Sequence, residues 1–326
     1  MFVYLLKRLL GMIPLIIGIT LISFSVIHMT PGDPTQLLTS MNPNASPEAS
    51  QKLVKMYNLD EPIHVQYWLW LKKVSVLDFG QSFALDGMSV TEKIANRLPY
   101  TIYLNVMSII LIFMIALPLG ILNAYYKDTF FDKISTVMVF MGFAVPTFWL
   151  ALLCMYFFGI QLGWLPISGL MSYNFSDLSL WGKFVDLAKH SILPVGVSVF
   201  GSLAGLSRYA RNSMLDVLNN DYVTAARARG LSERKVLFKH ALKNALLPII
   251  TIIGLSIPGL IGGSVIFESI FSIPGMGQLF YQSVMMRDYP VVMGILVIGA
   301  LLTLAGNLIA DILYAVVDPR IRYGKK

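Results

Sequence analysis

The stretch "YTIYLNVMSIILIFMIALPLGILNA" (Tyr100–Ala124) is apolar along its length and contains no charged side chain. A helix of about 20 mainly apolar residues is long enough to cross the roughly 30 Å hydrocarbon core of a bilayer. This stretch therefore predicts a membrane-spanning helix. The whole chain has a matching composition, because 56% of its 326 residues are hydrophobic and only 13% are charged, which is unusual for a soluble domain.

Five further windows have the length and composition of membrane spans. In chain order the six predicted spans are Leu9–Met29, Tyr100–Ala124, Ile134–Phe158, Ser191–Ser207, Leu246–Phe267 and Val291–Val316. The first window follows Lys7 and Arg8, as the core of a signal peptide would, but it is longer than the apolar core of about 7 to 15 residues found in cleaved signals. We therefore expect an all-α, polytopic membrane protein with six transmembrane helices and an uncleaved first span.

The distribution of Lys and Arg predicts the orientation in the membrane. If the N-terminus is cytoplasmic, six spans return the C-terminus to the same side, and 16 of the 25 Lys and Arg residues then fall inside. Six of the other nine lie in one long loop, where the positive-inside rule is weak. Both termini are therefore expected in the cytoplasm. The net charge of +7 needs no nucleic acid partner to explain it.

The only cysteine, Cys154, falls inside the third predicted span. It cannot form an intrachain disulfide, and we expect it to behave as a small buried apolar residue rather than as a metal ligand.

The segment between the first two spans, residues 30–99, is too long for a simple connector. We expect a helical extracytoplasmic insert there, with one short helix from Ser46 to about Tyr57 and a second over "HVQYWLWLKKV" (His64–Val74). The aromatic residues of the second helix are typical of a membrane interface, and a contact surface for an extracellular partner is the alternative. The expected divisions are residues 1–29, the insert 30–99, a transmembrane core 100–316 and a cytoplasmic tail 317–326.

Two loops on the predicted outer side have unusual compositions. "GWLPISG" (163–169) carries two glycines and a proline, which indicates a tight turn after the third span. "FESIFSIPGMGQLFYQSVMMRDYP" (Phe267–Pro290) is more apolar than a surface loop, although Pro274, Gly275 and Gly277 interrupt its helical stretches. We expect this second segment to fold back into the bundle.

A basic, helix-prone stretch, "DYVTAARARGLSERKVLFKHALKNALLPI" (Asp221–Ile249), lies in the predicted cytoplasmic loop 208–245. Asn220 or Asp221 is a suitable N-cap for a helix over 222–229, and Gly230 suits the left-handed position after that helix. Ser232 and Glu233 then begin a second helix that ends before Pro248. The sequence predicts a helix, a glycine turn and a second helix.

Ala225 and Ala226 keep one side of the first of these helices thin, which allows close approach of another surface.

Three interpretations of this loop compete. A basic loop can simply obey the positive-inside rule and meet anionic lipid headgroups, but this does not explain the two helices or the paired alanines. A DNA-binding helix-turn-helix would also be basic with a glycine turn, but tethering between two membrane spans disfavours it. The third interpretation is a docking element that transmits force from a soluble partner to the spans.

Within this loop, "TAARARG" (Thr224–Gly230) resembles the EAA loop of binding-protein-dependent ABC importer permeases. That loop forms the coupling helix, which sits in a groove of the ATPase subunit. Thr224 replaces the leading Glu of the general motif, and the distance from Gly230 to Pro248 is longer than in sugar importers. Both departures match the peptide and nickel branch, in which "HALKNALLP" (240–248) is also usual.

The resemblance extends over nearly the whole chain, to the B-type permease subunits of dipeptide and oligopeptide ABC importers. The segments that carry it are "LLKRLLGMIPLIIGITLISF" (5–24), "PGDP" (31–34), "LDEPIHVQYWLWL" (59–71), "VPTFWLALL" (145–153), "LGWLPISG" (162–169), "VIFESIFSIPGMGQLF" (265–280), "RDYPVVMG" (287–294) and "DPRIRYG" (318–324).

The resemblance implies partners and a division of labour. In that family two permease subunits, usually different, form one pathway, two ATPases bind their coupling helices, and an extracytoplasmic binding protein delivers the substrate. The sequence has no "GxxxxGK[ST]" phosphate loop, so ATP and Mg²⁺ are expected in the partner ATPases, and we expect this chain to bind no cofactor or metal and to have no catalytic residue.

Other function classes fit the sequence less well. A secondary transporter usually has more spans, arranged as repeats, and an intramembrane enzyme would need a motif such as "HExxH". Within the family, nickel, glutathione or another small solute remains the alternative cargo.

The resemblance also implies site residues. Those expected to couple to the ATPase are Asp221, Tyr222, Thr224, Ala225, Ala226, Arg227, Arg229, Gly230, Glu233 and Arg234. The arginines offer charge-assisted contacts to the partner, although Arg227 and Arg229 could equally be plain positive-inside residues. Candidates for the pathway or its gate are Glu268, Phe271, Pro274, Gly275 and Asp288.

Overall fold

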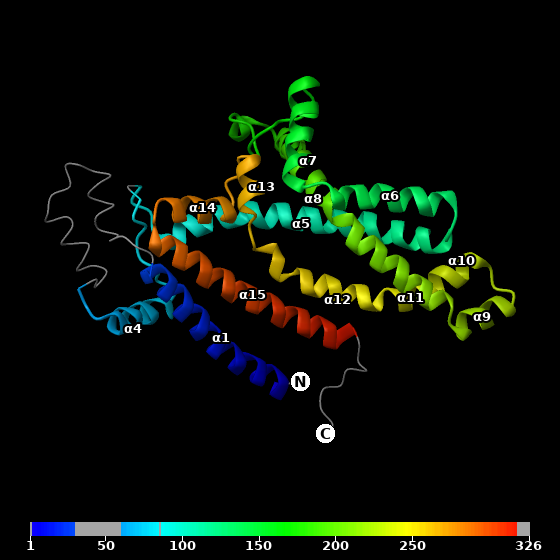
Figure 1. The fold of residues 1–326 in the computed structure, drawn as a ribbon, viewed down its shortest axis with the longest axis horizontal. Helices are drawn as coiled ribbons and strands as arrows, with labels where there is room; N and C mark the ends of the chain where they lie inside the picture. The colour runs from blue at the N-terminus through cyan, green and yellow to red at the C-terminus, as the bar shows by residue number, and fades with distance from the viewer. Residues whose placement is uncertain (1, 30–59, 85, 318–326) are drawn as a thin grey trace. The chain divides into compact units, whose positions relative to one another are not determined.

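The computed structural model describes residues 2–29, 60–84 and 86–317 (Figure 1). Within them the chain is helical, and the extended backbone is limited to an isolated bridge between Gln81 and Ser89. The helices are α1 Phe2–Met29, α4 Ile63–Val74, α5 Val90–Tyr125, α6 Phe130–Ala144, α7 Thr147–Cys154, α8 Leu180–Leu218, α9 Asp221–Ala228, α10 Glu233–Lys235, α11 Leu242–Ala245, α12 Leu247–Ser256, α13 Val265–Ile270, α14 Met276–Met285 and α15 Tyr289–Val317. The predicted all-α class is confirmed.

Four helices in the described part of the chain are long and apolar enough to cross a membrane. They are Leu6–Ser25 within α1, α5, α8, and Tyr289–Ile312 within α15. A fifth span arises if α6 and the helical stretch Thr147–Gln161 are counted together, although they are bent by 99°. Length and composition of the described helices thus support four or five of the six predicted spans.

The fifth predicted span, Leu246–Phe267, is not one continuous helix. Helix α12 ends at Ser256, a 3₁₀ turn covers Pro258–Leu260, and α13 begins at Val265. Proline has no N–H to donate within a helix, and the glycines that follow favour irregular backbone. The apolar composition of this window therefore predicted an apolar segment but did not predict the break in the helix.

The third and fourth spans have different limits from those predicted. Val145 is extended (φ −83°, ψ 128°), because the residue before a proline is disfavoured in the helical region, and this breaks the third span at Pro146. In contrast, α8 runs without a break from Leu180 to Leu218 and keeps Pro194 inside it. The hydropathy window marked only the apolar middle of this helix, since its two ends are helical but polar.

The chain forms two compact units. One contains the residues up to Pro99 together with Ile261–Val265 and Pro274–Ala305, and the other contains Tyr100–Leu260, Ile266–Ile273 and the residues from Gly306 onward.

In the first unit, α4 packs against α1. The hydroxyl of Tyr67 lies 3.0 Å from that of Thr20, and the ring of Phe24 contacts those of Tyr67 and Trp70, with centroids 5.3 and 5.8 Å apart. Trp68 is exposed. The predicted helix over His64–Val74 is confirmed, whereas the one predicted over Ser46–Tyr57 lies outside the described residues.

In the second unit, α5, α6 and α8 pack closely through small residues. A Cβ atom on Gly120 of α5 would clash with the backbone oxygen of Ser207 in α8, and one on Gly142 of α6 would lie 2.6 Å from that of Phe200. Close approach of this kind is typical of helices that associate in membranes. The same core takes up Cys154, which is half-buried.

Candidate functional site

The polar segment predicted to couple to a partner forms a compact element at the end of α8. Helix α9 follows α8 after Asn219 and Asn220, and α10, a π-helical segment (Val236–Ala241) and α11 complete it. We call residues 221–245 the α9–α11 element. Figure 1 shows α9 and α10 as a tip beyond the ends of α8 and α11.

Gly230 makes the turn between α9 and α10. Its φ is +76°, its N–H donates to the carbonyl of Arg227 at 2.9 Å, and the N–H of Leu231 donates to that of Ala226 at 3.4 Å. These two bonds form a Schellman motif, in which a left-handed residue ends a helix and satisfies its last carbonyls. The left-handed conformation predicted for Gly230 is confirmed.

The helix starts were predicted at nearly the right residues but for the wrong reason. Asn220 precedes α9, yet its side chain makes no capping hydrogen bond and instead donates to the carbonyl of Asp216 at 3.2 Å. The side chain of Ser232 does not cap α10 either. Helix α11 ends at Ala245, and α12 begins at Leu247. Pro248 lies in the first turn of α12, a position in which its missing N–H costs little.

One face of the element is buried against the chain itself. Val223 and Val236 are fully buried, and Ala226 is 5% exposed; they cluster with Leu218 and Leu231. The surface that approaches Ala226 closely is therefore part of this chain, and Ala225 is the alanine that stays exposed.

The opposite face is exposed. The candidate coupling residues on it are Asp221, Tyr222, Thr224, Ala225, Arg227, Arg229, Gly230, Glu233 and Arg234. Since nine of the ten candidates are exposed on one small element, the structure brings them together as a surface.

Two side-chain contacts brace this surface. The guanidinium of Arg227 donates to the carboxylate of Glu233 at 2.9 and 3.5 Å, which ties α9 to α10. The amide of Asn244 donates to the hydroxyl of Tyr222 at 2.8 Å, which ties α9 to α11. Exposed ion pairs add little stability, so the Arg227–Glu233 pair acts mainly on the geometry of the turn.

The three arginines of the surface therefore differ. Arg227 is engaged by Glu233, whereas Arg229 and Arg234 form no ion pair with the described carboxylates. Of the three, Arg229 and Arg234 keep their full capacity for a partner's acidic groups.

The pathway candidates are divided between the two units. Glu268 and Phe271 belong to the second unit and are 3% and 2% exposed. The hydroxyl of Thr101 donates to the Glu268 carboxylate at 3.1 Å, and the N–H of Gly169 donates to the Phe271 carbonyl at 2.8 Å. The segment Phe267–Pro290 is thus folded inward in part, as predicted, and Glu268 and Phe271 remain gate candidates.

The other three candidates, Pro274, Gly275 and Asp288, belong to the first unit. Pro274 is half-buried, and buried Gly275 precedes α14.

Asp288 is a structural anchor. Its carboxylate accepts from the hydroxyl of Ser82 at 2.5 Å and from the N–H of Phe83 at 3.0 Å, and Asp288 itself is 3% exposed. Lys93 lies 3.9 Å from Asp288 and 2.7 Å from Asp86. Burial acts to raise the pKa of the Asp86 carboxyl. The hydrogen bond and charge of Lys93 and the hydrogen bond from the Met88 N–H outweigh this, so the pKa of Asp86 is lowered. These contacts join Asp288 to the end of the insert, and its role in the pathway or gate stays a prediction.

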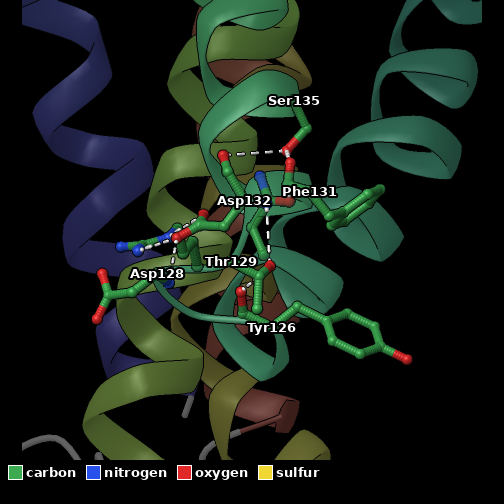
Figure 2. A network of polar contacts seen from close by, with 8 residues as sticks. Tyr126, Asp128, Thr129, Phe131, Asp132 and Ser135 are labelled. Atoms are coloured by element: carbon green, nitrogen blue, oxygen red, sulfur yellow. Dashed lines mark hydrogen bonds and ion pairs between the residues drawn. The ribbon is translucent and has the colours of Figure 1, made fainter.

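Sequence reasoning missed an ion pair between α6 and α8, in which the acid is buried and the base is partly exposed. Arg211 donates to both oxygens of Asp132, at 2.9 and 2.7 Å, and Asp132 is 5% exposed. Asp132 also accepts from the N–H of Asp128 at 3.1 Å. Figure 2 shows Asp132 within this network, beside Thr129 and Asp128 of the α5–α6 turn.

The sequence did contain one indication of this ion pair. Asp132 lies near the start of the third predicted span and Arg211 just after the fourth, so both are expected at the same membrane face. The number of charges at that face does not show which acid meets which base.

In the described part of the chain no cluster of three or more His, Cys, Asp or Glu side chains could hold a metal ion.

Two family models together match most of the chain. The model described as "Binding-protein-dependent transport system inner membrane component" matches residues 116–323, and that of its N-terminal part matches residues 1–105.

Curated relatives match over the full length. The chain is 46% identical to the oligopeptide transport system permease protein AppB of Bacillus subtilis, with 98% of this chain and 99% of that protein covered. It is 38% identical to the dipeptide transport system permease protein DppB of Alkalihalophilus pseudofirmus, over 99% and 100%. It is 36% identical to the glutathione transport system permease protein GsiC of Salmonella choleraesuis, over 98% and 99%.

Proposed function

This chain belongs to the family of binding-protein-dependent transport system inner membrane components, and we propose that it is the permease subunit of an importer of dipeptides or oligopeptides. Members of this family are transport permeases of ABC importers and are not catalytic, since the ATPase is a separate subunit. The chain is therefore a multi-pass inner-membrane protein that works with an ATPase and a binding protein.

The observation that carries the peptide cargo is the order of identity among full-length relatives. The oligopeptide and dipeptide permeases match at 46% and 38%, and the glutathione permease at 36%. Glutathione is itself a short peptide in its chemistry, so it is the second candidate cargo, supported by the third of these relatives.

For the assembly, the proposal is that a second homologous permease completes the pathway, that two ATPases bind ATP and Mg²⁺, and that both termini are cytoplasmic. The Lys and Arg bias supports this orientation. It places the α9–α11 element and the α5–α6 turn on the cytoplasmic side.

The α9–α11 element has the construction that coupling requires. Its exposed face is free for the ATPase, while its other face is tied into the second unit. The hydroxyl of Ser213 in α8 donates to the carbonyl of Ala245 in α11 at 2.8 Å, and buried Ala124, Met214 and Ala241 pack in one cluster. A displacement of the element therefore acts directly on α5, α8 and, through α11, on α12.

The function is tested by co-expressing the chain with its neighbouring permease and ATPase genes and measuring ATP hydrolysis in lipid nanodiscs. Binding protein loaded with dipeptides, oligopeptides or glutathione is added in parallel. Stimulation by the peptide-loaded protein is the expected result. If only the glutathione-loaded binding protein stimulates hydrolysis, the cargo is glutathione and not a dipeptide or oligopeptide. Failure of the ATPases to co-purify would refute the role of the α9–α11 element.

The Arg227–Glu233 pair gives a sharper test of the coupling surface. Arg227→Glu places two carboxylates together between α9 and α10, and we expect peptide-stimulated ATP hydrolysis to fall several-fold with the complex still assembled. The double variant Arg227→Glu/Glu233→Arg restores opposite charges and should recover most of the activity. Equal losses in the single and double variants would show that Arg227 contacts the partner directly and does not act through Glu233.

A further inference from the structure

A cavity of about 480 Å³ lies between α6 and α8, beside the Asp132–Arg211 pair. Its volume is within the range of pockets that hold small ligands, about 300 to 1,000 Å³. The α6 side supplies Lys133, Val137 and Phe140, and the α8 side supplies Arg208. All of these residues belong to the second unit.

The charge of the cavity is positive. The carboxylate of Asp132 is held by both donors of Arg211, so these two charges compensate each other. Lys133 and Arg208 are exposed and form no ion pair with a carboxylate in the described residues. The guanidinium of Arg208 lies 5.6 Å from the centroid of the Phe140 ring, a cation–π contact that keeps it at the cavity.

The cavity also has an apolar wall. Val137 and Phe140 are 60% and 38% exposed, and both line the same space as the two cations. Thr136, Asn123 and Asn212 add hydrogen-bonding side chains. An anion that carries apolar chains matches both parts, because its headgroup can meet the two cations while its chains lie against Val137 and Phe140.

We propose that this cavity binds the phosphate headgroup of an anionic phospholipid of the cytoplasmic leaflet, between Lys133 and Arg208, with the acyl chains along α6. This inference rests on the proposed function only for the cytoplasmic placement of the α5–α6 turn. Basic pockets between spans at that face are suited to anionic headgroups. Because α8 continues from Arg208 to Leu218, three residues before α9 begins, the bound lipid would brace the helix that carries the coupling element.

The test uses the purified chain with the partner subunits that accompany it, in detergent. Short-chain phosphatidylglycerol and phosphatidylcholine are titrated separately, and native mass spectrometry counts the bound lipids. We expect the wild type to prefer phosphatidylglycerol about tenfold. Lys133→Gln/Arg208→Gln should lose this preference, whereas Lys133→Arg/Arg208→Lys should keep it.

Lys7→Gln/Lys127→Gln is the matched control, because it removes two cations from the same predicted face outside the cavity. If this control loses the preference for phosphatidylglycerol to the same extent, the preference comes from general surface charge, and the proposal is overturned. Equal binding of the two lipids would do the same. Displacement of phosphatidylglycerol by inorganic phosphate or MgATP at similar concentration would show a free anion site instead of a lipid site.

The lipid site and the proposed function can fail separately. Loss of the ATPases on purification with the lipid preference intact would refute the coupling role alone. Peptide-stimulated hydrolysis without any lipid preference would refute the lipid site alone.

Discussion

Gly230→Val is expected to bring ATP-driven peptide uptake to about a tenth of the wild-type rate or lower while the chain still inserts into the membrane. At φ +76°, a β-branched side chain costs on the order of 1 to 3 kcal/mol, which shifts a conformational equilibrium about 5- to 150-fold. The strain is in the backbone alone, because a Cβ on Gly230 would meet no atom within 4 Å. The turn would relax and move the exposed face of α9 relative to α10.

Two variants make this result specific. Gly163 also has a positive φ, +64°, and an equally open surrounding, but it lies in the loop after the third span; Gly163→Val should therefore retain uptake. Gly230→Asn should recover much of the activity, since asparagine tolerates the left-handed region. The measurements are uptake in vesicles and the amount of ATPase that co-purifies. Normal uptake by a well-expressed Gly230→Val variant would remove the turn from the coupling mechanism.

The elements that sequence predicted best are those set by local chemistry. A long uncharged run such as Tyr100–Ala124 has few alternatives to a spanning helix, and a glycine after "TAARAR" has few alternatives to a left-handed turn. Both are present in the structure.

The features that sequence reasoning missed depend on neighbours distant in the chain. Whether Ala226 faces outward depends on Val236, which packs behind it, and hydropathy does not report that contact. Likewise, the hydrogen bond from Ser82 to the Asp288 carboxylate joins residues 206 positions apart. The Asp132–Arg211 pair joins residues 79 positions apart, and nothing local to either residue indicates the other.

This pair leads to the second large effect. We expect Asp132→Ala to lower the free energy of unfolding by about 1.5 to 3 kcal/mol, because it removes the charge-assisted hydrogen bonds from Arg211, whose side chain is 23% exposed. At about 2 °C per kcal/mol, the apparent Tm of the purified complex, followed by tryptophan fluorescence, should fall by roughly 3 to 6 °C. Asp128→Asn is the control, since it removes an exposed neighbouring carboxylate, and we expect it to change Tm little.

A double variant separates the ion pair from the position itself. Asp132→Asn/Arg211→Gln keeps hydrogen-bonding groups at both positions but removes both charges, so it should recover most of the lost stability. An Asp132→Ala variant as stable as the wild type would mean that water or lipid satisfies Arg211 in the membrane.

The structure also separates the stabilising role of the Asp132–Arg211 pair from lipid binding at the cavity. Asp132→Ala removes a negative charge but leaves Lys133 and Arg208, so it should lower Tm without weakening phosphatidylglycerol binding, whereas Lys133→Gln/Arg208→Gln should weaken binding with little loss of Tm.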